Sequence, residues 1–392
     1  MKILHIVPSY LPAHRYGGPV ESVHSLNVAL ARAGHEVTVY TTNIDGDRNL
    51  DVPVNEPVMK DGVHIFYFKA SFPRGWFYSS EMRRALATHI KEFDIVHITS
   101  VFLAASTLGA YYAKKFTKPY IISPRGSLMR APLAAHSFKK RAYLSLIEKR
   151  NLKGASAIHF TVPAEEVEYR SAGFPAKKAF VVPNSIPNGA HPDADREAFR
   201  KEWYIPNDNK TVLFLGRISP IKGLDTLVSA FSKVAQKISD VTLIIAGGDD
   251  RGYLDEIKKL VEVHTLSERV VFTGMLMGKE KEAAYRNADV FVVPSISESF
   301  GMSAVEAMQE GIATILTDGV GIADAALRAN AAVVIKKDTD ELANAMVELL
   351  EDKNKREELG QNAMKFVDRE YSETSVAKKM EDAYRQVIEV KR

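Results

Sequence analysis

The chain has 392 residues, of which 46% are hydrophobic and 26% are charged, and its formal net charge is +3 at pH 7. A chain of this length exceeds one ordinary hydrophobic core and predicts two domains of about 150–200 residues each. It contains no cysteine, which excludes disulfides, thiolate metal sites and a cysteine nucleophile.

Apolar, β-rich runs alternate with helical patterns through the first half of the chain. The spacing predicts strands at 3–7, 36–41, 63–68, 95–98, 120–123, 157–160 and 180–182, and helices at 20–33, 80–92 and 104–115. Gly34 follows the first helix, where a left-handed cap is expected. Strands that alternate with helices indicate a parallel sheet covered on both faces.

This rhythm stops at 183–209, where Pro, Asn, Gly and Asp are dense, and we interpret that segment as a linker. A second series follows, with strands at 211–216, 242–246, 270–273, 290–293, 313–317 and 332–335, and helices at 225–237, 253–264, 279–287, 303–310 and 321–329. Further helices are predicted at 340–350, around 356–369 and at 372–390. The expected fold is α/β, with Rossmann-like, doubly wound domains at 1–190 and 191–371 and a last helix, 372–392, that crosses back to the first domain.

Two glutamates, Glu298 and Glu306, flank the start of the helix that follows the apolar strand 290–293. Unpaired N–H groups and a partial positive charge at a helix N-terminus suit a phosphate-bearing ligand. The eight-residue interval alone carries little weight, because it recurs between Glu373, Glu381 and Glu389 in the last helix. The strand, loop and helix around Glu298 and Glu306 therefore make this segment a candidate site. The residues that lead into its helix are Phe300, Gly301, Met302 and Ser303.

Arg217 and Lys222 follow the strand 211–215, with glycines on each side of them. A guanidinium and an ammonium at one strand end can both bind a diphosphate. The alternative is a basic surface loop with helix-capping glycines.

Gly17 and Gly18 lie between the first strand and the first helix, where they would let backbone approach a ligand. A plain loop explains them equally well, and no G-x-G-x-x-G nicotinamide fingerprint follows a strand. His14 lies beside this glycine pair.

Three Asp-x-Asp sequences match the pattern with which some sugar transferases hold a cation. They are Asp45-Gly-Asp47, Asp193-Ala-Asp195 and Asp338-Thr-Asp340. All three fall in predicted loops away from the other candidates, so we interpret them as turns and expect neither a metal nor a cofactor. The segment 247–250, Gly-Gly-Asp-Asp, either lines a nucleotide pocket or forms a turn.

The charge is distributed unevenly along the chain. Residues 1–190 carry 24 Lys and Arg against 14 Asp and Glu, and residues 191–392 carry 28 against 35. Between 114 and 153 there are 11 basic residues and one acid, Glu148. This window is either a solvated helix face or a surface for anionic lipid or a pyrophosphate-bearing acceptor. Aromatic–glycine patterning of an RNA-binding type is missing, so a nucleic-acid partner is not expected.

No run approaches the roughly 18 apolar residues of a membrane-spanning helix. Pro8 interrupts the apolar N-terminus, and no small-residue cleavage site follows it, so a signal peptide is not expected. The prediction is a cytoplasmic protein, with peripheral contact to the inner face of the membrane through 114–153 as the open alternative.

Several short blocks occur in the order of one known family, and through them the chain resembles the family 4 retaining glycosyltransferases of the two-Rossmann-domain, GT-B type. The blocks are Pro8…Gly17-Gly18, Arg32-Ala-Gly-His-Glu-Val37, Val182-Pro-Asn184, Gly216-Arg217…Lys222-Gly223, Ala246-Gly247, Phe272-Thr-Gly274, Pro294-Ser295 and Glu298…Glu306. The resemblance covers the chain almost end to end. It implies two domains that face each other across a cleft.

The resemblance also implies roles for the candidate residues. Arg217 and Lys222 would bind the donor diphosphate, Glu298 the hydroxyls of the transferred sugar, and Glu306 the nucleotide ribose. The backbone N–H groups at 300–303 would meet the sugar and phosphates, and the pair Gly17 and Gly18 would face the diphosphate from the first domain. Retention of configuration and independence from metals are likewise implied by the family.

One block departs from the family pattern. Many members place a histidine after the strand that corresponds to 120–123, but this chain has Pro124-Arg125-Gly126. Arginine cannot act as a general base. Arg125 and His14 are therefore candidates for contacts with an acceptor or a phosphate only.

The expected activity is transfer of a hexosyl group from a nucleotide diphosphate sugar to a saccharide acceptor, lipid-linked and used in surface polysaccharide or glycan synthesis. UDP-sugar is the favoured donor, and GDP-mannose is the next. A sugar-nucleotide 2-epimerase of the same fold and a non-catalytic nucleotide-sugar-binding subunit are the alternatives.

Overall fold

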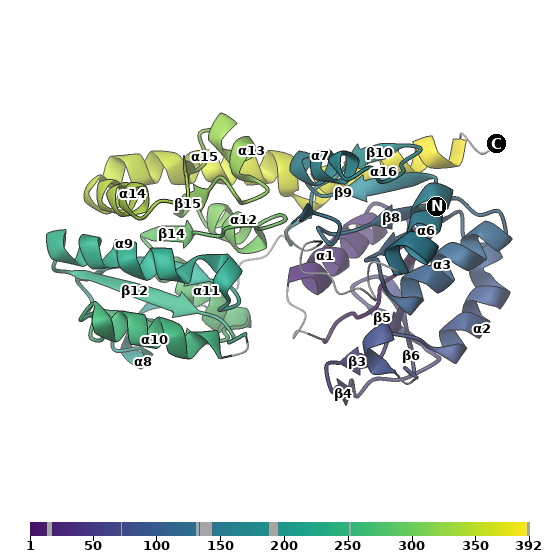
Figure 1. The fold of residues 1–392 in the computed structure, drawn as a ribbon, viewed down its shortest axis with the longest axis horizontal. Coiled ribbons are helices and arrows are strands. Elements are labelled where there is room, and N and C mark those ends of the chain that lie inside the picture. Colours follow the sequence, from purple (N-terminus) through teal and green to yellow (C-terminus); the bar gives the residue numbers. More distant parts are fainter. Residues whose placement is uncertain are drawn as a thin grey trace. The chain divides into compact units, whose positions relative to one another are not determined.

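The computed structural model describes residues 1–13, 18–71, 73–130, 133, 143–187, 195–250 and 252–389. The chain forms two compact units (Figure 1). Unit 1 contains Met1–Pro187 and Tyr371–Arg392, and unit 2 contains Asn188–Glu370. His14, Gly17, and the basic residues Lys139, Lys140 and Arg141 lie outside the described residues.

Unit 1 is built on a sheet with the strand order β10-β9-β8-β7-β1-β2-β6-β5. Its strands are β1 (Lys2–Ile6), β2 (Glu36–Thr42), β5 (Pro57–Lys60), β6 (Val63–Phe68), β7 (Ile95–Thr99), β8 (Tyr120–Ser123), β9 (Ala157–Phe160) and β10 (Ala179–Val181). All neighbouring strands pair in parallel except β5 and β6, which are antiparallel. A small separate hairpin joins β3 (Ile44–Asp45) to β4 (Arg48–Asn49).

Helices cover both faces of this sheet. The helical segments described in unit 1 are α1 (Gly18–Arg32), η2 (Arg74–Trp76), α2 (Ser80–His89), η3 (Ile90–Glu92), α3 (Ala104–Lys115), η4 (Leu144–Glu148), α6 (Lys149–Gly154), α7 (Pro163–Ser171) and α16 (Glu373–Glu389). Apolar residues of α1 and α16 pack with alternate residues of the strands, such as Ile3 and Ile95, on one face. The intervening residues, such as Leu4 and Val96, pack with α2, α3 and α6 on the other. The period of two along each strand thus buries both faces.

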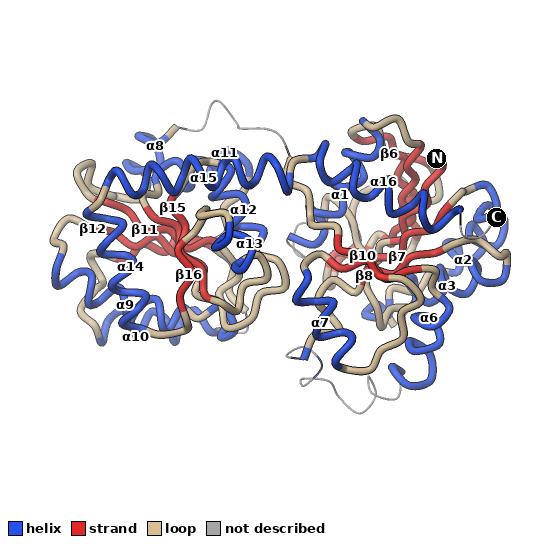
Figure 2. Tube along the Cα trace, turned by 90° about the horizontal axis from the view of Figure 1, so that it is seen from above, coloured by secondary structure: helices blue, strands red, loops and turns tan. Residues whose placement is uncertain are grey.

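Unit 2 is built on a six-stranded, wholly parallel sheet with the order β13-β12-β11-β14-β15-β16. Its strands are β11 (Lys210–Leu215), β12 (Val241–Ala246), β13 (Val270–Gly274), β14 (Val290–Val293), β15 (Ala313–Thr317) and β16 (Val333–Ile335). Its helical segments are α8 (Arg196–Glu202), η5 (Pro220–Lys222), α9 (Leu224–Lys237), α10 (Tyr253–Val263), α11 (Gly278–Asn287), α12 (Met302–Gln309), α13 (Ala323–Arg328), α14 (Thr339–Glu351) and α15 (Lys353–Tyr371), the last of which ends at the first residue of unit 1's C-terminal segment. Figure 2 shows the strands of each unit as a central layer between helices.

The α/β class and the parallel sheets of both units are confirmed. Several of the observed elements were not expected, among them α8, β5 and α7. The predicted linker 183–209 contains α8, which begins where the Asp195 carboxylate accepts hydrogen bonds from the N–H groups of Glu197 and Ala198. The edge strand β5 and the helix α7 were also missed, because short, mostly polar segments carry a weak periodic signal. Gly34 does adopt a left-handed conformation, with φ of 88°.

Candidate functional site

The strands β11 and β14 are neighbours in the unit 2 sheet, so the loops at their carboxyl ends meet. The first loop contains η5, whose last residue is Lys222, and the second carries Glu298. A backbone hydrogen bond of 2.9 Å from the Ile296 N–H to the Ile221 carbonyl joins the two loops. At this junction Lys222 Nζ forms an ion pair with Glu298 Oε2. Both side chains are about one-fifth exposed, at 19% and 20%, so a ligand can reach them.

Glycine makes this close approach of backbones feasible. Gly223 follows Lys222 with φ of 68°, and a Cβ there would collide with the Pro294 carbonyl. Gly319, after β15, is equally close to the Ile296 carbonyl. The Glu298 backbone is fixed from that side, because its N–H donates to the Gly319 carbonyl over 2.9 Å. The position of the Glu298 carboxylate therefore depends on three strand-end loops.

The helix α12 begins beside Glu298. Gly301 precedes it with φ of 105°, and a Cβ there would come within 2.8 Å of the Val320 side chain. The hydrogen-bond ladder of the helix starts with the N–H groups of Ala304 and Val305, which donate to the Gly301 carbonyl. The N–H groups of Met302 and Ser303 precede this ladder, so they can bind an anion. Phe300, one residue earlier, is buried at 3% exposure and anchors the turn.

Glu306 lies one turn further along α12 and is held from α11. Lys281 Nζ lies 3.0 Å from Glu306 Oε1, and the Tyr285 hydroxyl donates to Glu306 Oε2 over 2.7 Å. The same hydroxyl lies 3.2 Å from the Ser303 carbonyl. Sequence reasoning missed Lys281 and Tyr285. Their spacing of four on one helix was the available signal, but it does not reveal which element they face.

Arg217 does not join the Lys222–Glu298 pair in this structure. Its side chain is 66% exposed, and its Nη1 lies 3.7 Å from an Asp250 carboxylate oxygen. The neighbouring residue Ile218 bridges to Asp249, which ties this loop to the end of β12. Arg217 thus lies at the same sheet edge as Lys222 but keeps the freedom of an exposed, long side chain.

The described acidic residues form turns and caps, and Asp193 lies outside the described residues. Asp249 accepts from the N–H groups of Gly252 and Leu254 at the start of α10, and Asp338 caps α14 in the same way. Asp45 lies in the β3–β4 hairpin. Among the residues that the structure describes, no group of three or more His, Asp or Glu side chains is arranged to hold a metal ion.

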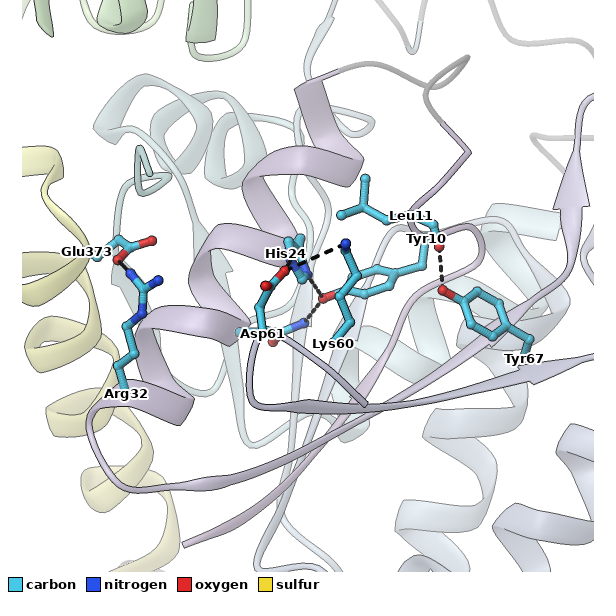
Figure 3. Close-up of polar contacts among 9 residues, drawn as sticks. Tyr10, Leu11, His24, Arg32, Lys60, Asp61, Tyr67 and Glu373 are labelled. Atoms are coloured by element: carbon cyan, nitrogen blue, oxygen red, sulfur yellow. Dashed lines mark hydrogen bonds and ion pairs between the residues drawn. The ribbon is translucent and has the colours of Figure 1, made fainter. Parts of the chain in front are cut away.

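In unit 1 the loop after β1 is fixed by side chains from three directions (Figure 3). The Tyr67 hydroxyl donates to the Leu11 carbonyl over 2.5 Å, and the Tyr10 hydroxyl lies 2.9 Å from His24 Nδ1. His24 Nε2 in turn lies 2.9 Å from an Asp61 oxygen. This loop leads toward the glycine pair, of which only Gly18 is described, as the first residue of α1.

Arg125 follows β8 at the carboxyl edge of the unit 1 sheet. It adopts a left-handed backbone with φ of 52°, an uncommon conformation for a side-chain-bearing residue. Its guanidinium donates to Asn184 Oδ1, while Nε is buried and has no hydrogen-bond partner among the described residues. Burial lowers the pKa of Arg125 to about 10, which leaves it a cation near neutral pH. A buried cation with an unused donor can bind an anionic or hydroxyl-bearing group.

Glu165 supports the loop that carries Arg125. Its carboxylate accepts hydrogen bonds from the Gly126 N–H over 2.6 Å and from the Thr161 N–H over 2.9 Å. Burial raises the pKa of Glu165, although these hydrogen bonds and the Arg125 charge act in the opposite direction.

A chain of buried aromatic side chains lies beneath this edge. His159 Nε2 donates to the Val182 carbonyl over 2.7 Å, because a carbonyl can only accept. His159 Nδ1 must then accept from His97 Nε2 at 3.2 Å, and His97 Nδ1 from the Tyr384 hydroxyl at 2.8 Å. His5 stacks on His97 with ring centroids 4.3 Å apart. Burial lowers the pKa of all three histidines, to about 3 for His5 and His159.

Exposed apolar and basic side chains lie at the end of α3 and in the described part of the basic window 114–153. Tyr111 on α3 and Leu146 on η4 are 55% and 63% exposed. The exposed basic residues of α3 and α6 are Lys114, Lys115, Lys149, Arg150 and Lys153. In the described parts of the chain, no helix has the length and apolar character needed to cross a membrane.

Two protein-family models match the chain, one in each half. The model described as "Glycosyl transferase 4-like domain" matches residues 17–185, and the one described as "Glycosyl transferases group 1" matches residues 195–366. An uncharacterized glycosyltransferase of Methanocaldococcus jannaschii is 26% identical over 402 aligned residues, spanning 100% of this chain and 99% of the relative. The GDP-mannose-dependent alpha-(1-6)-phosphatidylinositol monomannoside mannosyltransferase of Mycobacterium tuberculosis is 26% identical over 59% of this chain and 62% of its own.

Solved structures share the fold across nearly the whole chain. Anabaena HepE, solved in complex with UDP-glucose, superimposes with a TM-score of 0.77 at 20% identity, over 98% of this chain and 100% of that one.

Proposed function

The chain belongs to the family 4 glycosyltransferases of the GT-B type, and from this premise we propose that it transfers a hexosyl group from a nucleotide diphosphate sugar to a saccharide acceptor. Unit 2 binds the donor and unit 1 the acceptor. The transfer retains the anomeric configuration and needs no metal ion. The observation that carries the proposal is the Lys222–Glu298 pair beside the N-terminus of α12.

The chemistry of this pair fits a glycosyl transfer. Breaking the bond between the sugar and the diphosphate places negative charge on the leaving group and positive charge on the sugar ring. The Lys222 ammonium and the N–H groups of Met302 and Ser303 stabilise the first charge with fixed dipoles and a cation. The exposed Arg217 swings to the same diphosphate. These cations stabilise the negative charge of the leaving diphosphate, which a divalent metal stabilises in other transferases.

Glu298 and Glu306 have different tasks in this proposal. The Glu298 carboxylate accepts hydroxyls of the transferred sugar and favours the positive charge that develops on its ring. Glu306 is set by Lys281 and Tyr285, and it accepts the ribose hydroxyls of the nucleotide. In unit 1, Gly17 and Gly18 approach the diphosphate, while Arg125 and His14 contact the acceptor or a phosphate. The Nε of Arg125 has no hydrogen-bond partner among the described residues, which supports a contact between Arg125 and the acceptor or a phosphate.

The donor is a UDP-sugar in first place and GDP-mannose in second. HepE was solved with UDP-glucose, and the mycobacterial relative is named for GDP-mannose, so both bases occur among similar proteins. A thermal-shift panel of UDP-, GDP-, ADP- and TDP-sugars decides between them, because a ligand raises the melting temperature by mass action. The bound donor is then used in transfer assays with and without a chelator. Failure of every nucleotide sugar to shift the melting temperature would refute the proposal.

Stereochemistry is tested on the product by NMR of the anomeric proton. The same sample in deuterated water separates transfer from epimerisation at C2 of the sugar, since only epimerisation places deuterium at that carbon. Loss of activity in the chelator, restored by a divalent cation, would contradict the metal-independent mechanism.

The acceptor is a lipid-linked saccharide in this proposal, and the surface around Tyr111 and Leu146 binds anionic membrane. Exposed apolar side chains among basic residues suit an interface with anionic headgroups. The double variant Lys149→Glu, Arg150→Glu should lose binding to phosphatidylglycerol vesicles at low salt. Lys336→Glu, Lys337→Glu makes the same charge change on exposed residues of unit 2 and should bind as wild type. Equal binding by both would leave this surface a solvated helix face.

A further inference from the structure

Unit 1 contains a cavity that no part of the proposed transfer reaction uses. Its volume is about 650 Å³, within the range of about 300–1,000 Å³ common for small-molecule sites. It lies between the β2–β6 side of the sheet and the segment α2–η3. Its lining includes Thr38, Tyr40, Phe66 and Phe68 of the sheet, Phe93 after η3, and Arg84 and Ala85 of α2. None of its lining residues belongs to the strand-end loops that carry Arg125 or the glycine pair.

The inner wall of the cavity is aromatic. Tyr40 lies edge-on to Phe66 and Phe68, with ring centroids 5.5 and 5.0 Å away, and Phe93 is 6.4 Å away. The Phe66 and Phe68 rings are near-parallel, at 14°. Tyr40 pairs with Phe66 across neighbouring strands, which places them on one face of the sheet. Tyr40, Phe68 and Phe93 are at most 7% exposed, so the partly exposed Phe66 ring is the main apolar surface open to a ligand ring.

Two hydroxyls of this wall are open to the cavity. Thr38 and Tyr40 are only 6% and 3% exposed, both line the cavity, and neither side chain has a hydrogen bond to any residue that the structure describes. Burial raises the pKa of Tyr40 to about 12, with the Glu92 charge acting in the same direction, so the hydroxyl keeps its proton and can both donate and accept. Neither oxygen is among the fully enclosed polar atoms that lack a partner, so both are open to the cavity, where a ligand hydroxyl can replace water as their partner.

The charges at the rim indicate which class of ligand fits. Three carboxylates, Glu36, Glu81 and Glu92, face two cations, Lys2 and Arg84, among the lining residues. Lys2 lies 3.4 Å from Glu36, and His89 lies 2.8 Å from Glu92, so part of this charge is already paired. The excess of carboxylates disfavours phosphates and other anions, and the two wall hydroxyls disfavour an acyl chain. A neutral ring with several hydroxyls satisfies both conditions.

We propose that this cavity is a second saccharide-binding site, which takes a neutral pyranose unit separately from donor and acceptor. One face of the sugar ring lies against the aromatic wall, the Thr38 and Tyr40 hydroxyls bond its inner hydroxyl groups, and Arg84 and the rim carboxylates bond the outer ones. Such a site holds a saccharide chain on the enzyme at a point away from the reaction centre.

The test is saturation-transfer NMR with a panel of methyl glycosides of glucose, galactose, mannose and N-acetylglucosamine on the full chain. Ala85→Trp places a bulky ring in the cavity and should abolish the signal. Thr88→Trp puts the same ring on an exposed position of the same helix, outside the cavity, and should keep it. Lys222→Ala should also keep the signal, which separates this site from the donor site.

Tyr40→Phe removes one hydroxyl and leaves the ring. The signal should weaken about threefold to tenfold, the worth of one hydrogen bond. The unfolding midpoint should be unchanged or higher, because that hydroxyl bonds nothing in the free protein. A purely structural tyrosine would instead lower the midpoint and leave sugar binding alone. No signal from any glycoside, or equal signals from Ala85→Trp and Thr88→Trp, would overturn the proposal.

Discussion

At the scale of single residues, the candidate donor site depends on a cation and a carboxylate that hold each other in place. Lys222 and Glu298 are 76 positions apart in the sequence, yet they form an ion pair at the carboxyl edge of one sheet. Each is partly exposed, so the pair can open toward a ligand without leaving a buried charge behind. Arg217 differs, since its only recorded ion pair within the described chain is the loose one with Asp250.

Lys222→Ala and Glu298→Ala should each reduce the transfer rate at least tenfold, about 1.4 kcal/mol in the activation barrier. Loss of Lys222 removes charge from the leaving diphosphate, and loss of Glu298 removes contacts to the sugar. Steady-state transfer assays measure both. Lys233→Ala is the matched control, because it removes an exposed lysine paired with Asp340 in the same unit. Near-normal rates in both site variants would contradict the assignment.

At the residue scale the structure also assigns a support to Glu306. Tyr285→Phe removes the hydroxyl that donates to its carboxylate and leaves the ring in place. If Glu306 binds ribose, the donor Kd should rise about threefold to tenfold while kcat changes less, since one neutral-to-charged hydrogen bond is lost from a positioning residue. Titration of donor binding and the rate at saturating donor separate the two quantities. A fall in kcat with no change in Kd would place Tyr285 in another role.

At the scale of elements, the site is made by turns that only glycine permits. η5 ends at Lys222 and α9 begins at Leu224, so Gly223 alone reverses the chain between them. Gly301 has the same position before α12. Because these glycines face backbone or packed side chains, the orientation of Lys222 and of the α12 N-terminus is fixed by contact between loops.

Gly223→Ala should destabilise unit 2 and weaken donor binding, since a Cβ there meets the Pro294 carbonyl and also strains a positive φ. We expect a loss of about 2–4 kcal/mol in the free energy of unfolding. Gly252→Ala is the control, because it has φ of 87° but open space around its Cβ position. It should cost only the backbone strain, about 1 kcal/mol or slightly more. Urea unfolding measures both variants, and equal losses would show that the contact with Pro294 has no effect.

At the scale of the whole molecule, the C-terminal helix is part of the N-terminal unit. Val376, Met380 and Tyr384 of α16 pack in the same core as Ile3 and Val23. Tyr384 also completes the hydrogen-bond chain that runs through His97 and His159 to the Val182 carbonyl. The C-terminal helix α16 therefore completes the core of unit 1, although it follows unit 2 in the sequence.

The buried histidines should make unit 1 sensitive to acid. Their folded pKa values lie below the usual value near 6.5, so below about pH 6.5 the unfolded chain binds protons that the folded chain does not. Stability is then retained above pH 6.5 and lost as the pH falls, by about 3–4 kcal/mol between pH 7 and 5.5 for the three together.

Urea unfolding at both pH values measures this loss. His159→Gln should reduce the difference by about one third, and His89→Gln, which replaces a half-exposed histidine, is the control for the substitution itself. The same difference in wild type and His159→Gln would show that other groups cause the acid sensitivity.

The sequence by itself determined the class of fold and the ends of strands where the candidate residues lie. Apolar periodicity is local, so the strands of both sheets and the positions of Lys222 and Glu298 after β11 and β14 followed from it. Short blocks in family order indicated the glycosyltransferase family, which the comparisons confirmed. The roles of the individual site residues stay predictions.

Only the tertiary structure decided which side chains are partners. The Lys281 and Tyr285 contacts to Glu306, the unused Nε of Arg125, the histidine chain closed by Tyr384 and the aromatic cavity all join residues from separate elements. A periodic pattern records which face of its own helix or strand a residue occupies. It contains nothing about what the opposite element presents, because that depends on strand order and packing across long stretches of chain.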